Sequence, residues 1–87
     1  MQPEKEKRKF DYAKLKDLII STKSDSNKYY NRTTFSAKIG ISYYTLLKKL
    51  NSDVSFTQGE IIKISELLNI KNEEIPKYFF ELKIEKT

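Results

Sequence analysis

The stretch RTTFSAKIGISYYTLLKKLN, residues Arg32–Asn51, decides the fold of this 87-residue chain. Gly40 divides it into two halves with helical spacing of small and apolar side chains. The first half predicts one buried face, made by Phe35, Ser36 and Ile39. The second half opens on Ser42 as a helix cap and predicts a second apolar stripe, made by Tyr43, Leu46, Leu47 and Leu50. We therefore expect helices over 32–39 and 43–50 with a tight turn between them.

The outer face of the second helix carries three side chains that the core does not require: Tyr44, Thr45 and Lys48. Tyr and Thr form single hydrogen bonds and Lys reaches guanine acceptors or phosphate, so this chemistry suits the edges of bases. Two helices crossing at a glycine turn form a helix-turn-helix, whose second helix enters the DNA major groove. Arg32 and Asn51 flank the pair and are candidates for phosphate contact, although an exposed Arg32 without a ligand is the simpler alternative.

The composition limits the classes of function. A chain of 87 residues makes one domain, and the absence of Cys and His removes disulfides, the common zinc sites and the usual general base. With no phosphate-binding glycine loop and no clustered carboxylate pair, we do not expect an enzyme or a cofactor. We expect no second domain to receive a small-molecule ligand, and hence no such ligand. The longest apolar run is too short for a membrane span and no signal peptide is evident, so we expect a cytoplasmic, nucleoid-associated protein.

The net charge of +5 is unevenly distributed. Residues 1–10 have four basic and two acidic side chains (+2), residues 11–50 have eight and three (+5), and residues 51–87 have five and seven (−2). Positive charge gathered on one half favours a polyanion as partner. The alternative is a merely solvated, lysine-rich surface. Residues 1–9 form a basic arm that we expect to be disordered, and a solvated tail is the preferred interpretation over a DNA-tracking arm.

The segments on either side of the central stretch are predicted from their periodicity. A core helix is expected over 11–21, capped by Asp11, followed by a long polar loop over 22–31. Tyr29 and Tyr30 at the end of this loop are open to three interpretations: packing, DNA contact or partner contact. Thr57-Gln58-Gly59-Glu60 is a capping box that begins a helix ending at Asn69.

The C-terminal part predicts a short helix and then a change of period. A helix is expected over 73–78, capped by Asn72. Apolar and charged residues then alternate over Phe80–Ile84, as in a half-buried strand. Such a strand must pair with another chain, return onto its own domain or fray, and pairing across a two-fold axis is preferred. The domain boundaries expected are an arm at 1–9, a helix-turn-helix domain at 10–79 and a tail at 80–87.

At the central stretch the sequence resembles the helix-turn-helix of the lambda-type repressor and Cro family, also called the XRE type. The resemblance runs from about Phe10 to Ile75 and is strongest to a small phage- and prophage-associated subgroup. Its matching pieces are FDYAKLK at Phe10–Lys16, GISYYTLLKKLN at Gly40–Asn51, FTQGEIIKISELLNI at Phe56–Ile70 and EEIPKYFF at Glu73–Phe80. The resemblance implies an all-α, five-helix, lambda-repressor-like domain, here with a C-terminal strand.

The resemblance also implies roles for individual residues. The family's base-reading positions fall on Tyr43, Tyr44 and Lys48, with Ser42 and Thr45 beside them. Its phosphate-contacting positions fall on Arg32 and Asn51, and three neighbouring side chains are added as phosphate contacts: Thr33, Lys38 and Lys49. The sequence departs from the family in its longer loop before Arg32, in tyrosines where the family often reads bases with Arg or Gln, and in Lys49, where many relatives have an apolar residue.

The leading hypothesis is a sequence-specific regulator of transcription that binds a double-stranded DNA operator. It would be a Cro-like or early phage repressor that excludes polymerase as a homodimer, joined through Phe80–Ile84. The competing hypothesis is a protein-interaction module of the same fold, which binds a repressor, an antirepressor or a host factor through the tyrosine-bearing loop and the C-terminal strand.

Overall fold

The computed structural model describes residues 10–82, so the predicted basic arm and the last five residues lie outside the described part. Within that part the chain is all-α, as predicted, with five α-helices and one short 3-10 helix, η2. None of these helices is long and apolar enough to cross a membrane. The bounds are α1 Ala13–Ile20, α2 Arg32–Ile39, α3 Tyr43–Leu50, α4 Gln58–Leu68, η2 Asn72–Glu74 and α5 Ile75–Phe79.

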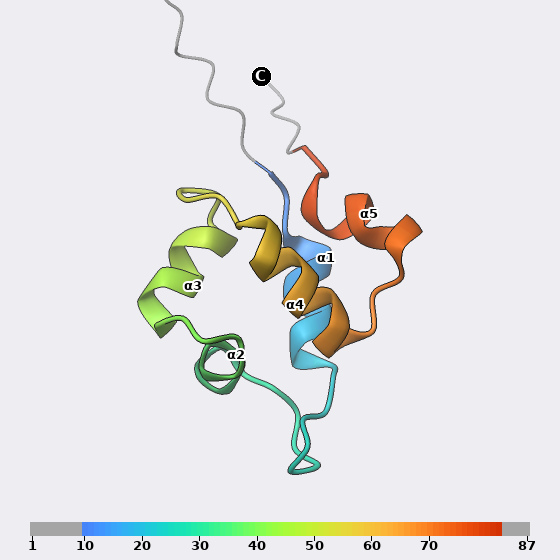
Figure 1. Ribbon diagram of the computed structural model, residues 1–87. Helices are drawn as coiled ribbons and strands as arrows, with labels where there is room; N and C mark the ends of the chain where they lie inside the picture. The colour runs from blue at the N-terminus through green and yellow to red at the C-terminus, as the bar shows by residue number, and fades with distance from the viewer. Residues whose placement is uncertain (1–9, 83–87) are drawn as a thin grey trace, which may run out of the picture.

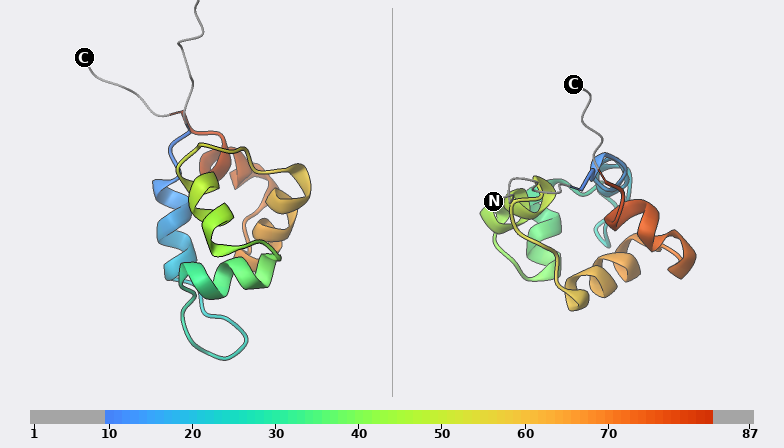
Figure 2. Two further views of the ribbon diagram at one scale, coloured as in Figure 1. Left: turned by 90° about the vertical axis from the view of Figure 1, so that its left-hand side faces the viewer. Right: turned by 90° about the horizontal axis from the view of Figure 1, so that it is seen from above.

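The helices surround one apolar core (Figure 1). In this view α1 and α4 lie centrally, with α2 and α3 on one side and α5 on the other, and the view from above agrees (Figure 2). Each of the five α-helices places at least one fully or nearly fully buried apolar side chain in the core, which ties the two sides together. The most deeply buried are Leu15, Ile19, Phe35, Leu46, Ile64 and Phe79.

Two of the predicted helix starts are confirmed by capping boxes. Asn31 accepts a hydrogen bond from the Thr34 N–H at 2.8 Å and completes a capping box at the start of α2. Thr57 and Glu60 form the predicted box at the start of α4. Each such cap stabilises a helix by about 1 kcal/mol, which matters for helices of two turns.

The first and last helices differ from their predicted bounds. The Asp11 carboxylate accepts the Ala13 N–H at 3.0 Å, but helical backbone begins only at Ala13. The predicted helix over 73–78 is split into η2 and α5. Pro76, in the first turn of α5, has no N–H, so the chain closes a tighter turn first through the Glu74 N–H and the Lys71 carbonyl at 2.8 Å.

The long loop before α2 is an ordered, hairpin-like turn that projects from the body beneath α2 (Figures 1 and 2). Lys23 and Tyr29 form an antiparallel bridge, and Asn27 at its tip has a positive φ of 66°. The two tyrosines take different roles: Tyr30 is buried against Phe35, with ring centroids 5.4 Å apart, whereas Tyr29 is exposed. The packing interpretation therefore holds for one of them only.

The predicted C-terminal strand is reduced, in the described residues, to a single antiparallel bridge between Phe10 and Leu82. The Asp11 N–H donates to the Glu81 carbonyl at 2.7 Å, and the Phe80 ring meets the Phe10 ring edge-on. This short segment returns onto its own domain as far as Leu82. Residues 83–87, which complete the predicted strand, lie outside the described part.

Candidate interaction face on α2 and α3

The turn between α2 and α3 has the geometry predicted for Gly40. This residue has φ 83°, a left-handed conformation that favours glycine. The N–H groups of Gly40 and Ile41 both donate to the Ser36 carbonyl, at 2.9 and 3.0 Å, which ends α2 and directs the chain into α3. In Figure 1 α2 is seen nearly along its axis while α3 runs across the view, so the two helices cross rather than lie parallel.

Only part of the predicted apolar stripe of α3 is buried. Leu46 and Leu50 lie in the core, but Tyr43 is 47% exposed and Leu47 is partly exposed. The prediction that Tyr43 and Leu47 belong to the buried stripe is wrong. The strip of α3 that contacts the core is narrower than the helical spacing of its apolar residues indicated. Tyr44 is 68% exposed. The outward surface of α3 is therefore aromatic and aliphatic as well as polar.

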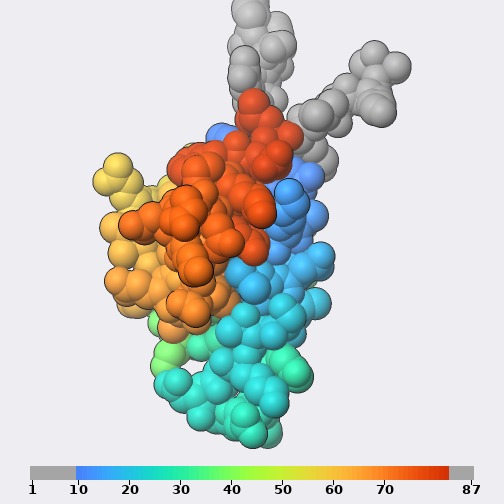
Figure 3. All heavy atoms as spheres, turned by 90° about the vertical axis from the view of Figure 1, so that its right-hand side faces the viewer, coloured from blue at the N-terminus to red at the C-terminus, as the bar shows by residue number. Residues whose placement is uncertain are grey.

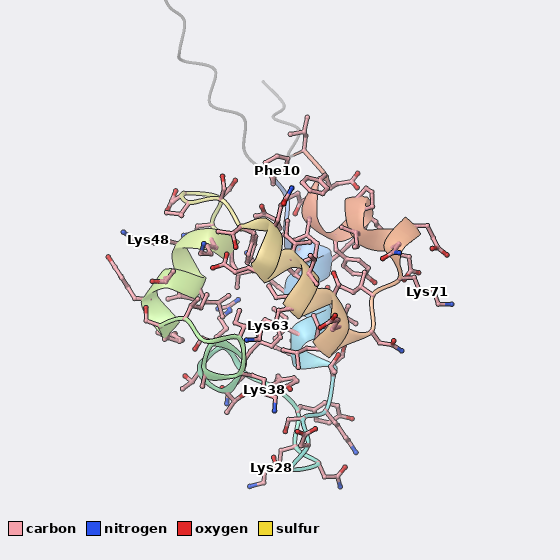
Figure 4. All side chains as sticks on the ribbon, viewed as in Figure 1. Phe10, Lys28, Lys38, Lys48, Lys63 and Lys71 are labelled. Carbon is pink, nitrogen blue, oxygen red and sulfur yellow. The ribbon has the colours of Figure 1, made fainter. Side chains whose placement is uncertain are left out.

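The hydroxyl groups at the start of α3 are occupied by the cap. Ser42 Oγ accepts the Thr45 N–H at 3.0 Å and donates to Thr45 Oγ1 at 2.9 Å. Lys48, one turn later, places its ammonium 5.1 Å from the centre of the Tyr44 ring, a cation–π distance. In Figure 4 Lys48 points away from the body of the molecule. Of the predicted base-contacting side chains, Tyr43, Tyr44 and Lys48 are thus the most available.

The predicted phosphate contact of Lys49 is wrong. Its side chain is buried, and its ammonium donates to Oε1 of Glu60 at 2.8 Å and to the Ser55 carbonyl at 2.9 Å. Burial alone would raise the pKa of Glu60, but the hydrogen bonds from Lys49 and the Thr57 N–H, with the Lys49 charge, outweigh it and hold this pKa below its ordinary value. Lys49 therefore clamps α3 onto α4 and is not available to a phosphate.

The other predicted phosphate-contacting side chains remain at the surface. Arg32 and Thr33 are exposed in the first turn of α2, and Asn51 is exposed at the C-cap of α3. Lys38 pairs with Asp25 at 3.2 Å, and both side chains are largely exposed, so this pair adds little stability. We call the exposed set the α2–α3 face; its members are Arg32, Thr33, Lys38, Tyr43, Tyr44, Leu47, Lys48 and Asn51.

Basic residues outnumber acidic ones around the α2–α3 face, where Asp25 is paired with Lys38 and Asp53 follows the C-terminal end of α3. No Asp or Glu occurs between residues 26 and 52, a span with five basic residues, of which Lys49 is turned inward. The turned view shows α2 and α3 side by side on this side of the molecule (Figure 2). The opposite side is formed by α5 and the acid-richer C-terminal residues together with α1 (Figure 3).

The predictions missed two features of this region. The first is the inward orientation of Lys49, which its position three residues after the buried Leu46 could have indicated. The second is the exposed Tyr29 beside the start of α2, with Lys23 5.3 Å from its ring. Its alternation with the buried Tyr30 follows from the hairpin, which the sequence did not predict.

Comparisons with known proteins agree with this fold. Residues 8–82 match the model of a family described as "Protein of unknown function (DUF739)". Among solved structures, the chain is similar to the modulator of repression (MOR) of the temperate bacteriophage TP901-1 from Lactococcus lactis, with 31% identity and a TM-score of 0.65. That match covers 82% of this chain and 88% of the phage protein. A comparison with curated protein sequences gives no match. The chain belongs to the DUF739 family and shares its helical fold with a small phage regulatory protein.

Proposed function

We propose that this protein is a phage-type regulator that modulates repression by binding another regulatory protein through its α2–α3 face. The observation that carries the proposal is the character of α3, whose outward surface exposes the rings of Tyr43 and Tyr44, with Leu47 partly exposed beside them. Aromatic side chains are enriched at the centres of protein–protein interfaces, where they bury large areas at low entropic cost. The likeness to a phage modulator of repression supports a role in the same kind of regulation.

The polar groups of α3 support protein contact over base reading. Ser42 and Thr45 are engaged with each other in the helix cap, and Lys49 is engaged with Glu60. Lys48 is then the one charged side chain that α3 itself offers to a ligand. Specific DNA binding usually combines bidentate base contacts with several phosphate contacts, and α3 has no Arg, Asn or Gln for the bidentate part.

A second candidate is sequence-specific DNA binding by a Cro-like repressor of the lambda type. Two observations favour it: the α2–Gly40–α3 geometry of a helix-turn-helix, and the absence of acidic residues between positions 26 and 52. Such a protein would act as a homodimer on half-sites about 34 Å apart and would block polymerase sterically. Residues Phe80–Ile84 would supply the dimer contact.

One pair of measurements separates the two candidates. The full-length chain is titrated with the purified repressor of the same phage or prophage by calorimetry, and separately with the DNA that flanks its own gene by mobility shift. We expect saturable binding to the repressor, weakened by Tyr44→Ala but not by Tyr29→Ala. A sequence-specific shift of the DNA by this chain alone, with no binding to the repressor, would support the second candidate instead.

A further inference from the structure

We infer that the partner surface which packs on α3 is acidic at its edge, with at least one carboxylate placed to meet Lys48. This inference rests on the proposed function and names the chemistry of its partner. It follows from the position of one ammonium group beside one exposed ring, and from the charges around them.

The first step is the geometry of Lys48 and Tyr44. The Lys48 ammonium lies 5.1 Å from the centre of the Tyr44 ring, and the ring is 68% exposed. A protein that covers the Tyr44 ring therefore also covers part of this ammonium. Removing an ammonium from water is costly unless an opposite charge or several hydrogen bonds replace the water. The Tyr44 ring compensates a small part of that cost, so the partner must supply the rest.

The second step is that no carboxylate among the described residues pairs with this ammonium. Within residues 10–82, Lys48 forms no ion pair, in contrast to Lys38 with Asp25 and Lys49 with Glu60. Acidic residues are absent from position 26 to position 52. The adjacent charge on the face comes from Arg32 and from Lys38, which keeps 44% of its side-chain surface. Basic side chains outnumber the two nearby carboxylates, Asp25 on Lys38 and Asp53 after the end of α3, so a basic partner surface would meet net repulsion there.

The third step is the choice between an acidic protein and a nucleic acid. Both carry negative charge, but the ring of Tyr44 is flanked by Tyr43 and the partly exposed Leu47. An apolar centre with a charged edge is the arrangement of protein interfaces, whereas DNA offers Leu47 and the rings only thymine methyl groups as apolar contacts. The observations thus favour an acidic protein surface with apolar side chains at its centre. Nucleic acid is an outcome that the test can detect.

The test measures the affinity of the full-length chain for the full-length repressor of the same phage or prophage. Lys48→Glu reverses the charge beside Tyr44, and Tyr44→Ala removes the ring. Lys71→Glu is the matched control, because Lys71 is exposed on the opposite side of the molecule (Figure 4). Each variant is titrated by calorimetry at about 50 mM and about 500 mM salt, since exposed charge interactions weaken with screening. Circular dichroism verifies that each variant is folded.

We expect Lys48→Glu to weaken binding by at least about tenfold, as like charges now face each other, and we expect high salt to weaken the wild-type complex. Lys71→Glu should change the affinity less than about twofold. If Lys48→Glu binds as tightly as the wild type while Tyr44→Ala weakens binding, the inference that the partner surface is acidic is overturned and the proposed function stands. If neither variant changes repressor binding, or if no binding occurs, the proposed function fails as well. A further outcome is that the chain shifts flanking DNA without binding the repressor, and that Lys48→Glu abolishes this shift. That result overturns both the proposed function and the acidic partner surface, and it identifies nucleic acid as the ligand.

Discussion

The ammonium of Lys49 lies 2.8 Å from Oε1 of Glu60, and this buried ion pair joins α3 to α4. The same carboxylate oxygen accepts the Thr57 N–H at 2.9 Å, so Glu60 serves the capping box and the ion pair together. The Lys49 side chain is 6% exposed and that of Glu60 is 18% exposed. The orientation of α3, and hence of its outward surface, depends on this contact as well as on Leu46 and Leu50.

Replacing Lys49 by Met should destabilise the protein by about 3 kcal/mol, because the substitution leaves the Glu60 carboxylate without its counter-ion. The value lies at the lower end for a broken buried pair, since Glu60 retains some contact with water. The adjacent Lys48→Met is the control and should change the free energy of unfolding by less than about 0.5 kcal/mol. Urea denaturation measures both. Equal effects of the two substitutions would contradict the assignment of Lys49 as a buried clamp.

The Lys49–Glu60 pair should also make stability depend on pH in the acidic range. Because the folded protein holds the pKa of Glu60 below its ordinary value, the unfolded chain binds a proton more readily. The stabilisation from this carboxylate is therefore complete above its unfolded pKa and is lost as the pH falls through the folded pKa. In Glu60→Gln the loss of stability between about pH 6 and about pH 3 should be smaller than in the wild type. Thermal melts over this range measure it, and parallel pH profiles would refute the prediction.

The two glycines offer a matched pair of substitutions. Gly40→Ala should destabilise the protein by about 1–2 kcal/mol, because Gly40 has φ 83° and an L-residue is strained there. Gly59→Ala, within α4, should stabilise it by about 0.5 kcal/mol, because alanine favours helix and a Cβ at that position meets no atom within 4 Å. Chemical denaturation distinguishes opposite signs directly. A Gly40→Ala variant as stable as the wild type would mean that the turn is not in the left-handed conformation.

The two loop tyrosines should differ sharply in their effect on stability. Tyr30→Ala should cost about 3 kcal/mol, because the ring is 6% exposed and packs edge-on against Phe35. Tyr29→Ala should cost less than about 0.5 kcal/mol, because Tyr29 is 60% exposed. The difference in denaturation midpoint between the two variants is the measurement. A comparable loss from Tyr29→Ala would show that the hairpin depends on its bridge side chains.

The fold was predictable where local chemistry and periodicity agreed. Asn31, Ser42 and Thr57 each have the side chain that a helix start requires, and each caps the predicted helix. The ends of the chain were less predictable. The bridge between Phe10 and Leu82 depends on a contact between residues distant in the sequence, which periodicity does not contain. The split before α5 is a local effect of Pro76 and the Lys71–Glu74 turn, which the spacing of apolar residues does not show either.

The candidate site was predictable in position but not in detail. The outward orientation of Tyr44 and Lys48 followed from helical spacing alone. The burial of Lys49 did not follow from helical spacing. A lysine on the buried side of a helix can turn out to solvent or form an ion pair, and here the outcome depends on a carboxylate eleven residues away. The exposure of Tyr43 and Leu47 depends on how closely α3 approaches α2 and α4, and the helical spacing of residues contains no information on that distance.

The most direct test of the account is an amide chemical-shift map of the isotope-labelled chain, recorded as the unlabelled repressor of the same phage or prophage is added. We expect the perturbed amides to cluster at Tyr43, Tyr44, Leu47 and Lys48 and to spread to the start of α2, while α5 is unaffected. Perturbations confined to α1 and α5, or changes at α3 that require DNA and not the repressor, would contradict it.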